Sequence, residues 1–244
     1  MVVAIEKLMD PVLQRLQKLE RSLLLCILAG VWLGLALPGS AIAATLNIPI
    51  DQARQQPDGV EVMVTGIVTV PSGHFASANL DQGFAIQDQN GGIYVSTESH
   101  LGLQAGQTVQ VVGTLQDDGH GQRVLSLKHW QADVTSSAVL PSGLLPQSAS
   151  VQEAITQLDG KLVTVQGTIT RSLVDDAPYG DRLWLADDTG IVQIYIPRST
   201  GITPQELRFL KPGQEIQVTG FSSQYDLNDE VMPRWIEDVR LMGK

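Results

Sequence analysis

The sequence is poor in cysteine and in positive charge. Its 244 residues include a single cysteine, Cys26, so neither a disulfide framework nor a cysteine-rich zinc site can be built. There are 16 Lys and Arg residues against 26 Asp and Glu residues, which gives a formal net charge of −10. A chain this acidic repels phosphate backbones at long range, so nucleic-acid binding would require local support from particular residues.

Signatures of catalysis are absent as well. The sequence contains no nucleophile elbow, no phosphate-cradling loop and no zincin motif. Imidazole and carboxylate groups such as His74, His120 and Asp117-Asp118 are ordinary ligands of transition metals, but their spacing fits no known metal signature. We therefore predict a protein with no catalytic residues, no cofactor and no bound metal.

An apolar run near the N-terminus, Leu23–Leu37, has the length of the hydrophobic region of a signal peptide. Arg21 precedes it, and a small-x-small pattern follows that is suited to cleavage after Ala43. The run is shorter than the ~20 residues that a bilayer span needs, and Pro38 ends it. We expect residues 1–44 to be an export signal or, if uncleaved, an N-terminal membrane anchor. In both cases the body of the protein is extracytoplasmic, either periplasmic or secreted.

A predicted β-hairpin, Phe84–Val95, is the stretch from which the domain organisation follows. Apolar residues alternate on both sides of a polar turn at Asp88–Gly92, where glycine tolerates the positive φ of tight turns. About 100 residues later, Leu183–Ile196 repeats this design. A duplicated hairpin indicates a duplicated domain.

The segments around the hairpin repeat in the same order. The aligned pairs are Pro49–Val70 with Ser150–Arg171 and Ile93–Val95 with Ile194–Ile196 at a shift of 101, and Leu103–Gly113 with Leu210–Gly220 at a shift of 107. From the change in shift we infer that six residues enter the second copy between its third and fourth strands. They include the capping box Thr203–Glu206, which predicts a short helix there.

Each copy is predicted to be a short helix followed by five strands. Pro49 and Asp51 start the first helix and the capping box Ser150–Glu153 starts the second, and an Asp-Gly pair ends each of them. Gly66 and Gly167 fall inside the first strand of each copy, where glycine marks a bulge or a sharp bend. The predicted strands are Val60–Val70, Gly83–Gln87, Gly92–Ser96, Thr108–Leu115 and Arg123–Trp130 in the first copy, and Leu162–Arg171, Arg182–Ala186, Val192–Pro197, Glu215–Phe221 and Val231–Leu241 in the second.

Five strands with a bent first strand describe an OB-type barrel. We therefore predict an all-β chain with short helices, made of two tandem OB-type five-stranded barrels after the N-terminal segment. The predicted domains are residues 45–131 and 149–244. The linker between them, 132–148, is rich in Ser, Pro and Val and is expected to be semi-extended.

The motifs of the first copy resemble those of a known class of module. They are Pro57-Asp58-Gly59-x-x-Val62-x-Val64-x-Gly66, Phe84-x-Ile86-Gln87-Asp88-x-x-Gly91-Gly92-Ile93-x-Val95 and Leu103-x-x-Gly106-Gln107-x-Val109-x-Val111-x-Gly113. These motifs are similar to the OB-fold accessory modules of secreted bacterial nucleases, and the similarity covers both copies. In that family the nuclease activity belongs to a separate domain, which is absent here. The resemblance implies an exported tandem OB protein with affinity for single-stranded nucleic acid and without cleavage.

The candidate ligand face lies on the second copy, because OB barrels bind across strands two and three and the loops beside them. If Leu183, Leu185, Ile194 and Ile196 point inward, then Gln193 and most of the candidate residues point outward. Stacking of bases on the aromatic rings is worth ~1–3 kcal/mol per base, and the arginines would meet phosphates. The candidate ligand-binding residues are Arg171, Tyr179, Arg182, Trp184, Tyr195 and Arg198.

Two observations keep other interpretations open. Trp and Tyr on a sheet face also cover neighbouring domains, so Trp184 and Tyr195 could instead pack against the linker or the first copy. The loops beside this face carry Asp175, Asp176 and Asp181 on one side and Asp226 to Glu230 on the other. These carboxylates disfavour polyanions unless a cation such as Ca²⁺ intervenes, and they have no EF-hand spacing.

The sequence thus predicts a non-catalytic exported binding module. The leading hypothesis is single-stranded DNA binding through the second copy. The alternative is an envelope adaptor that binds proteins or oligosaccharides and has no nucleic-acid role. The first copy offers only Ala85, Gln87 and Tyr94 on the matching face, and we expect it to be the structural or protein-contacting copy.

Overall fold

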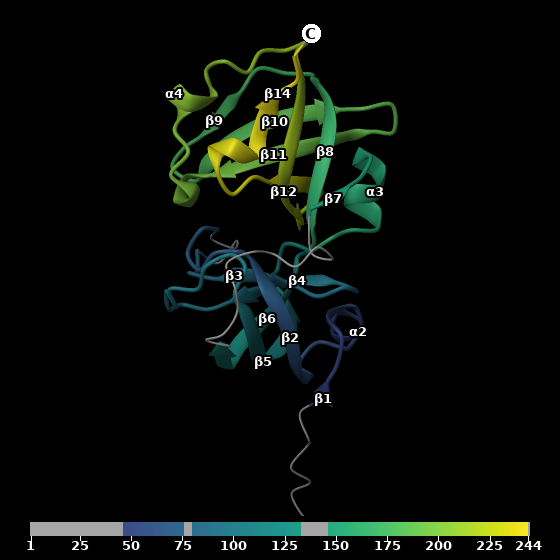
Figure 1. The fold of residues 1–244 in the computed structure, drawn as a ribbon, viewed down its shortest axis with the longest axis vertical. Coiled ribbons are helices and arrows are strands. Elements are labelled where there is room, and N and C mark those ends of the chain that lie inside the picture. Colours follow the sequence, from purple (N-terminus) through teal and green to yellow (C-terminus); the bar gives the residue numbers. More distant parts are fainter. Residues whose placement is uncertain (1–45, 76–79, 133–145, 244) are drawn as a thin grey trace, which may run out of the picture. The chain divides into compact units, whose positions relative to one another are not determined.

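The structure is a computed structural model that describes residues 46–75, 80–132 and 146–243 (Figure 1). The expected export signal at 1–44 and residues 133–145 of the expected linker lie outside these ranges. Within the described ranges, no helix is both long enough and apolar enough to cross a membrane.

The first barrel is a closed sheet of five strands. Its strands are β2 (Glu61–Val70), β3 (Phe84–Gln87), β4 (Gly92–Ser96), β5 (Thr108–Asp117) and β6 (Arg123–Ala132). They follow the order β2-β3-β4-β6-β5, and pairing of β2 with β5 closes the barrel. The two-residue strand β1 (Leu46–Asn47) pairs with β2 in parallel. Helix α2 (Ile50–Arg54) packs against β2 and β4.

The second barrel has the same topology. Its strands are β8 (Leu162–Ile169), β10 (Gly180–Ala186), β11 (Ile191–Pro197), β12 (Glu215–Tyr225) and β13 (Asn228–Met232), with the short strands β7 (Gln147–Ser148), β9 (Val174–Asp176) and β14 (Val239–Leu241) at its edges. The order β8-β10-β11-β13-β12 closes where β12 pairs with β8. The predicted fold class is confirmed: the described chain is mostly β and forms two OB-type barrels.

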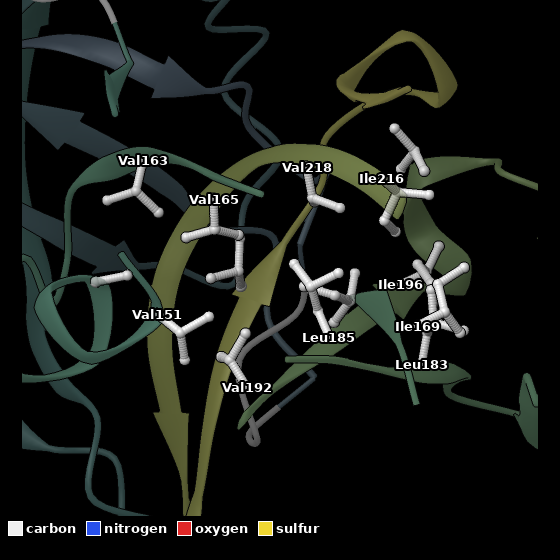
Figure 2. Close-up of a cluster of buried hydrophobic side chains, with 14 of the residues drawn as sticks. Val151, Val163, Val165, Ile169, Leu183, Leu185, Val192, Ile196, Ile216 and Val218 are labelled. Atoms are coloured by element: carbon white, nitrogen blue, oxygen red, sulfur yellow. The ribbon is translucent and has the colours of Figure 1, made fainter. Parts of the chain in front are cut away.

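Each barrel closes around its own aliphatic core. In the second barrel, Leu183, Leu185, Ile194 and Ile196 point inward and are almost completely buried, as the alternation predicts. Figure 2 shows Leu183, Leu185 and Ile196 in one cluster with side chains of β8, of β12 and of helix α3 (Val151–Thr156). The first barrel has an equivalent, separate core that includes Ile50 of α2. Burial of these alternating side chains is what stabilises both barrels.

An aspartate in each hairpin turn joins the turn to the start of the helix. Asp187 Oδ2 accepts a hydrogen bond from the backbone N–H of Val151 at 2.8 Å, and its Oδ1 accepts from Thr189 N at 2.7 Å. In the first barrel, Asp88 Oδ2 accepts from Ile50 N at 2.8 Å. These carboxylates satisfy helix N–H groups that have no partner inside the helix.

The hairpin turns also correct the alignment of the two copies. Because Asp88 and Asp187 occupy the same place, the shift through the hairpin is 99, and Tyr94 corresponds to Gln193 rather than to Tyr195. In the hairpin, the alignment at a shift of 101 was therefore wrong by two residues, which is one period of the alternation along a strand. The error arose because β11 carries an aromatic residue, Tyr195, two positions beyond the residue equivalent to Tyr94. Between the hairpin and β12, the second copy therefore carries eight extra residues rather than six. They contribute to the short helices η2 (Arg198–Thr200) and α4 (Pro204–Leu207), and α4 begins at the predicted capping box.

Other predicted boundaries change in detail. The last predicted strand, Val231–Leu241, is split into β13 and β14 by a loop and the short helix η3 (Ile236–Asp238). The helices α2 and α3 end at Arg54 and Thr156, several residues before the Asp-Gly pairs. Gln147–Ser148, which the sequence assigned to the linker, pairs with β8 as strand β7.

The mid-strand glycines mark close approach of neighbouring strands. A Cβ atom at Gly66 would lie 3.1 Å from the carbonyl oxygen of Gln87, and one at Gly167 would overlap the carbonyl of Ala186. The bulge expected near Gly66 falls instead between Val68 and Val70. The glycines let the first strand of each barrel pass close to the second strand.

We expect Asp187→Ala to lower the free energy of unfolding by about 1–3 kcal/mol, because the N–H groups of Val151, Thr189 and Gly190 lose their acceptor. Burial raises the pKa of Asp187, but hydrogen bonds from Thr189, Val151 and Gly190 outweigh it and lower the pKa overall. The effect of the substitution should therefore shrink as the pH falls and the wild-type carboxylate is protonated.

Urea denaturation at neutral pH and at low pH measures this difference. Asp188→Ala, at the neighbouring position, is the matched control and should change stability by less than about 0.5 kcal/mol. Equal losses in the two variants would contradict the proposed role of Asp187.

Candidate functional site

Three strands of the second barrel turn one row of side chains outward. In β10 and β11, Trp184 lies opposite Gln193 and Arg182 lies opposite Tyr195. Strand β13 runs beside β11 and places Glu230 next to Gln193. Of the candidate residues, the structure therefore brings Arg182, Trp184 and Tyr195 together on one face, which we call the second-barrel face, together with Gln193 and Glu230.

Arg182 and Arg198 are paired with aspartates of β9 and β10. Arg182 forms an ion pair with Asp176 in β9. Arg198 forms ion pairs with Asp175, at 2.7 Å, and with Asp181. Both guanidinium groups are thus engaged by carboxylates of the same barrel.

Arg171 and Trp184 form the open end of the face. The Arg171 guanidinium carbon lies 5.0 Å from the centre of the Trp184 ring, within the range of a cation–π interaction. Arg171 is exposed and Trp184 is half-buried. Tyr179, in the loop after β9, is 56% exposed. These three side chains are therefore accessible to a ligand.

Tyr195 is in a different position, at the covered end of the face. It packs against an apolar cluster that contains residues of both barrels, including Tyr94 and Phe221. Tyr195 thus lies at the edge of the cluster that joins the two barrels, which is closer to the alternative of packing than to an open stacking position. Burial raises the pKa of the Tyr195 hydroxyl, and the nearby carboxylates of Asp176 and Glu230 raise it further.

Glu230 is the residue whose position the sequence did not predict. It was assigned to an acidic loop, but it lies in β13 and is only 6% exposed. The Gln193 amide donates a hydrogen bond to it. Burial raises the pKa of Glu230 to about 7, although the Gln193 hydrogen bond and the Arg182 charge act against this shift. The alternation of β13 continued back from Val231 would have placed Glu230 on the outer face.

The matching face of the first barrel is covered by the second barrel. By the corrected alignment its central row is Ala85, Tyr94 and Val124, and these side chains are at most 1% exposed. They pack against Phe221 and Met232 of the second barrel. A soluble ligand therefore cannot reach this row in the structure.

The two loop histidines of the first barrel also contact the second barrel. His74 Nε2 is 2.9 Å from the carbonyl oxygen of Arg234, and His120 Nδ1 is 2.9 Å from Asp226 Oδ1. Burial lowers the pKa of His74. In the described part of the chain, no three His, Cys, Asp or Glu side chains come together in a way that could hold a metal ion.

No protein-family model matches the chain, and no curated protein matches it. Among solved structures it is similar to an OBody bound to hen egg-white lysozyme, with 20% identity and a TM-score of 0.31, over 39% of this chain and 94% of that one. It is also similar to the hypothetical protein ygiW from E. coli (18% identity, TM-score 0.29, 39% and 90% of the two chains). A third match is an OB domain from Methanosarcina mazei (14% identity, TM-score 0.34, 41% and 86%).

The class of the fold rests on the strand order of the two barrels rather than on these similarities. None of the three matched proteins is described as a nuclease module, so the resemblance to such modules stays a prediction.

We expect Glu230→Gln to stabilise the protein at alkaline pH. The folded protein keeps a proton on Glu230 that the unfolded chain releases above its ordinary pKa of 4.5, so stability falls as the pH rises from about 4.5 to about 7. The substitution removes the charge and keeps an acceptor for Gln193. The gain at pH 8 should be on the order of 2 kcal/mol, with little difference near pH 4.5.

Urea denaturation across this pH range measures the gain. Glu215→Gln, on the exposed side of β12, is the control and should show no comparable gain. A gain for Glu230→Gln that does not vary with pH would contradict the assignment.

Proposed function

We propose that this chain is a non-catalytic, extracytoplasmic binding module of the OB type. Its ligand face is the second-barrel face, and its ligand is an uncharged or basic chain, an oligosaccharide or a protein segment. The observation that carries this proposal is the pairing of Arg182 and Arg198 with Asp175, Asp176 and Asp181. The extracytoplasmic location rests on the sequence pattern of residues 1–44.

The difference in accessibility between the two barrel faces supports the choice of the second-barrel face. OB barrels bind ligands across strands two and three. In the first barrel this surface is buried under Phe221 and Met232, whereas in the second barrel Trp184, Arg171 and Tyr179 are accessible. A half-buried Trp beside planar polar groups offers a flat apolar ring together with hydrogen-bond partners.

The charge of this face supports the choice of ligand. Three aspartates engage two arginines, and among the described residues no arginine lies at hydrogen-bond distance from the nearly buried Glu230. Near neutral pH, carboxylates equal or outnumber the guanidinium groups. A polyanion would have to displace carboxylates from both arginines, and it would lose most of the charge attraction that drives nucleic-acid binding.

Single-stranded DNA binding remains the second candidate, and the Arg171–Trp184 pair is the observation that favours it. A base could stack on the Trp184 ring while Arg171 contacts a phosphate. On this hypothesis binding would weaken steeply with rising salt.

The two candidates are distinguished by removing one carboxylate. We expect wild-type protein to show no salt-dependent binding of a labelled oligothymidine, measured by fluorescence anisotropy at low and moderate salt. Asp176→Asn should free the Arg182 guanidinium and make salt-sensitive binding of the oligothymidine detectable at low salt. Asp188→Asn removes the same charge in the hairpin turn and should leave the affinity unchanged.

Tight, salt-sensitive binding of oligothymidine to the wild-type protein, lost in Trp184→Ala, would overturn the proposal in favour of DNA binding. Titration of Trp fluorescence with neutral oligosaccharides and with a basic peptide then tests the proposed ligand classes. Trp130→Phe, in the first barrel, is the control for the fluorescence signal.

A further inference from the structure

The contact between the barrels uses, on the first barrel, all three parts of the surface by which OB barrels in general hold ligands, the face of strands two and three and the two loops beside it. The first part is the strand face, where Ala85, Tyr94 and Val124 pack under Phe221 and Met232. The Phe221 ring centre lies 6.4 Å from that of Tyr94. The loop residue Phe75 is also buried in this contact, and its ring centre lies 6.3 Å from the ring centre of Phe221.

The second part is the loop between the first two strands of the barrel, β2 and β3. His74 in this loop faces the Trp235 ring, with ring centres 5.5 Å apart, and its Nε2 lies 2.9 Å from the Arg234 carbonyl. Arg234 in turn donates from Nη1 to the carbonyl oxygen of Thr69 at 3.0 Å. The guanidinium of Arg234 forms an ion pair with Asp238, and Arg234 as a whole is only 7% exposed.

The third part is the loop between the last two strands, β5 and β6. The His120 ring is stacked on the Tyr225 ring, with centres 4.5 Å apart and an angle of 9° between planes. The backbone N–H of Asp226 donates to the His120 carbonyl at 2.6 Å. The tip of the β12–β13 hairpin is therefore held by this loop.

Backbone contacts complete the fit at the strand face. The side chain of Gln87 accepts a hydrogen bond from Leu162 N at 2.8 Å. The backbones of Gly92 and Gly160 touch, because a Cβ atom on either glycine would overlap the carbonyl oxygen of the other. Arg54 donates to Gly92 O and forms an ion pair with Asp159.

We propose that the ligand face of the first barrel is a protein-recognition surface and that its ligand is the second barrel. This inference goes beyond the proposed function, since it gives a binding role to the barrel that has no open ligand face. Strand face and both flanking loops are the elements by which OB barrels hold their ligands. An apolar centre with a buried Arg and a Trp, bordered by polar contacts, is the composition of a specific protein interface.

The fit is specific for the second barrel. Phe221 lies in the apolar cluster between the barrels, and its paired neighbour in β8 is Leu162, whose backbone N–H donates to Gln87. The equivalent pair in the first barrel is Thr114 and Glu61, and Glu61 is exposed and forms an ion pair with Lys128. A first barrel offered to this surface would place a charged side chain where Leu162 lies, at the cost of desolvating it.

The test separates the docking from the covalent connection. A protease site is introduced within residues 133–145 of the full chain, the purified protein is cleaved, and the products are analysed by size-exclusion chromatography and native mass spectrometry. We expect the two fragments to stay together as a 1:1 complex at about 1 µM, which corresponds to a micromolar or lower Kd.

Interface variants then show whether this surface holds the complex. Arg234→Ala should weaken the association at least about tenfold, and Arg208→Ala, at an exposed position of the same barrel, should leave it unchanged. Gln87→Ala tests the surface from the first barrel and removes only one hydrogen bond, so its folding is less at risk. Circular dichroism of each uncut variant verifies the fold.

Separation of the wild-type fragments on cleavage would overturn the proposal, because the contact would then depend on the covalent connection. Association that is unaffected by both Arg234→Ala and Gln87→Ala would overturn it as well. Neither result would affect the proposed ligand face of the second barrel, which is tested by ligand titration.

Discussion

The outward face of strands two and three in each barrel has to be covered or kept polar, and this constraint separates the two copies. In the first barrel the row Ala85, Tyr94 and Val124 is apolar at its two ends, and it is stable because Phe221 and Met232 bury it. In the second barrel the equivalent row is Trp184, Gln193 and Glu230, in which the Gln193 amide donates a hydrogen bond to the Glu230 carboxylate. Two copies of one architecture thereby acquire different surface chemistry.

The contact that covers the face of the first barrel also restricts the motion of the two barrels relative to each other. The buried Arg234 and the glycine contact at Gly92 and Gly160 leave little freedom between the barrels. A ligand bound near Trp184 would therefore be held at a set place relative to both barrels. Tandem modules on a flexible linker can reach two separate binding sites, with an effective concentration set by the linker, whereas a fixed pair presents one surface.

Much of the fold followed from local pattern. Alternation at Leu183, Leu185, Ile194 and Ile196 identified the core of the second barrel, and the capping boxes located α3 and α4, because both signals lie within a few residues of sequence. The alignment of β4 with β11 failed, because the equivalent residues are identified by the strand pairing and by the hydrogen bonds of Asp88 and Asp187 rather than by similar side chains.

The candidate site was predicted less completely, for a physical reason. The sequence identified Arg182 and Arg198 as well as the acidic loop, but the ion pairs between them depend on how β9 folds back on β10. The contacts of Arg234 with Thr69 join residues far apart in the chain, and no periodicity signals such a pair. The sequence thus identified which residues belong to the site, whereas the partner of each residue could be seen only in the structure.

The difference between Leu162–Phe221 and Glu61–Thr114 has a consequence for the history of the chain. After a duplication the two halves would at first have been interchangeable. With Phe221 and Leu162 in one half and Thr114 and Glu61 in the other, the halves can no longer exchange roles. A gene with two copies of the first half would encode two barrels that each place the Glu61 charge against the apolar face of the other.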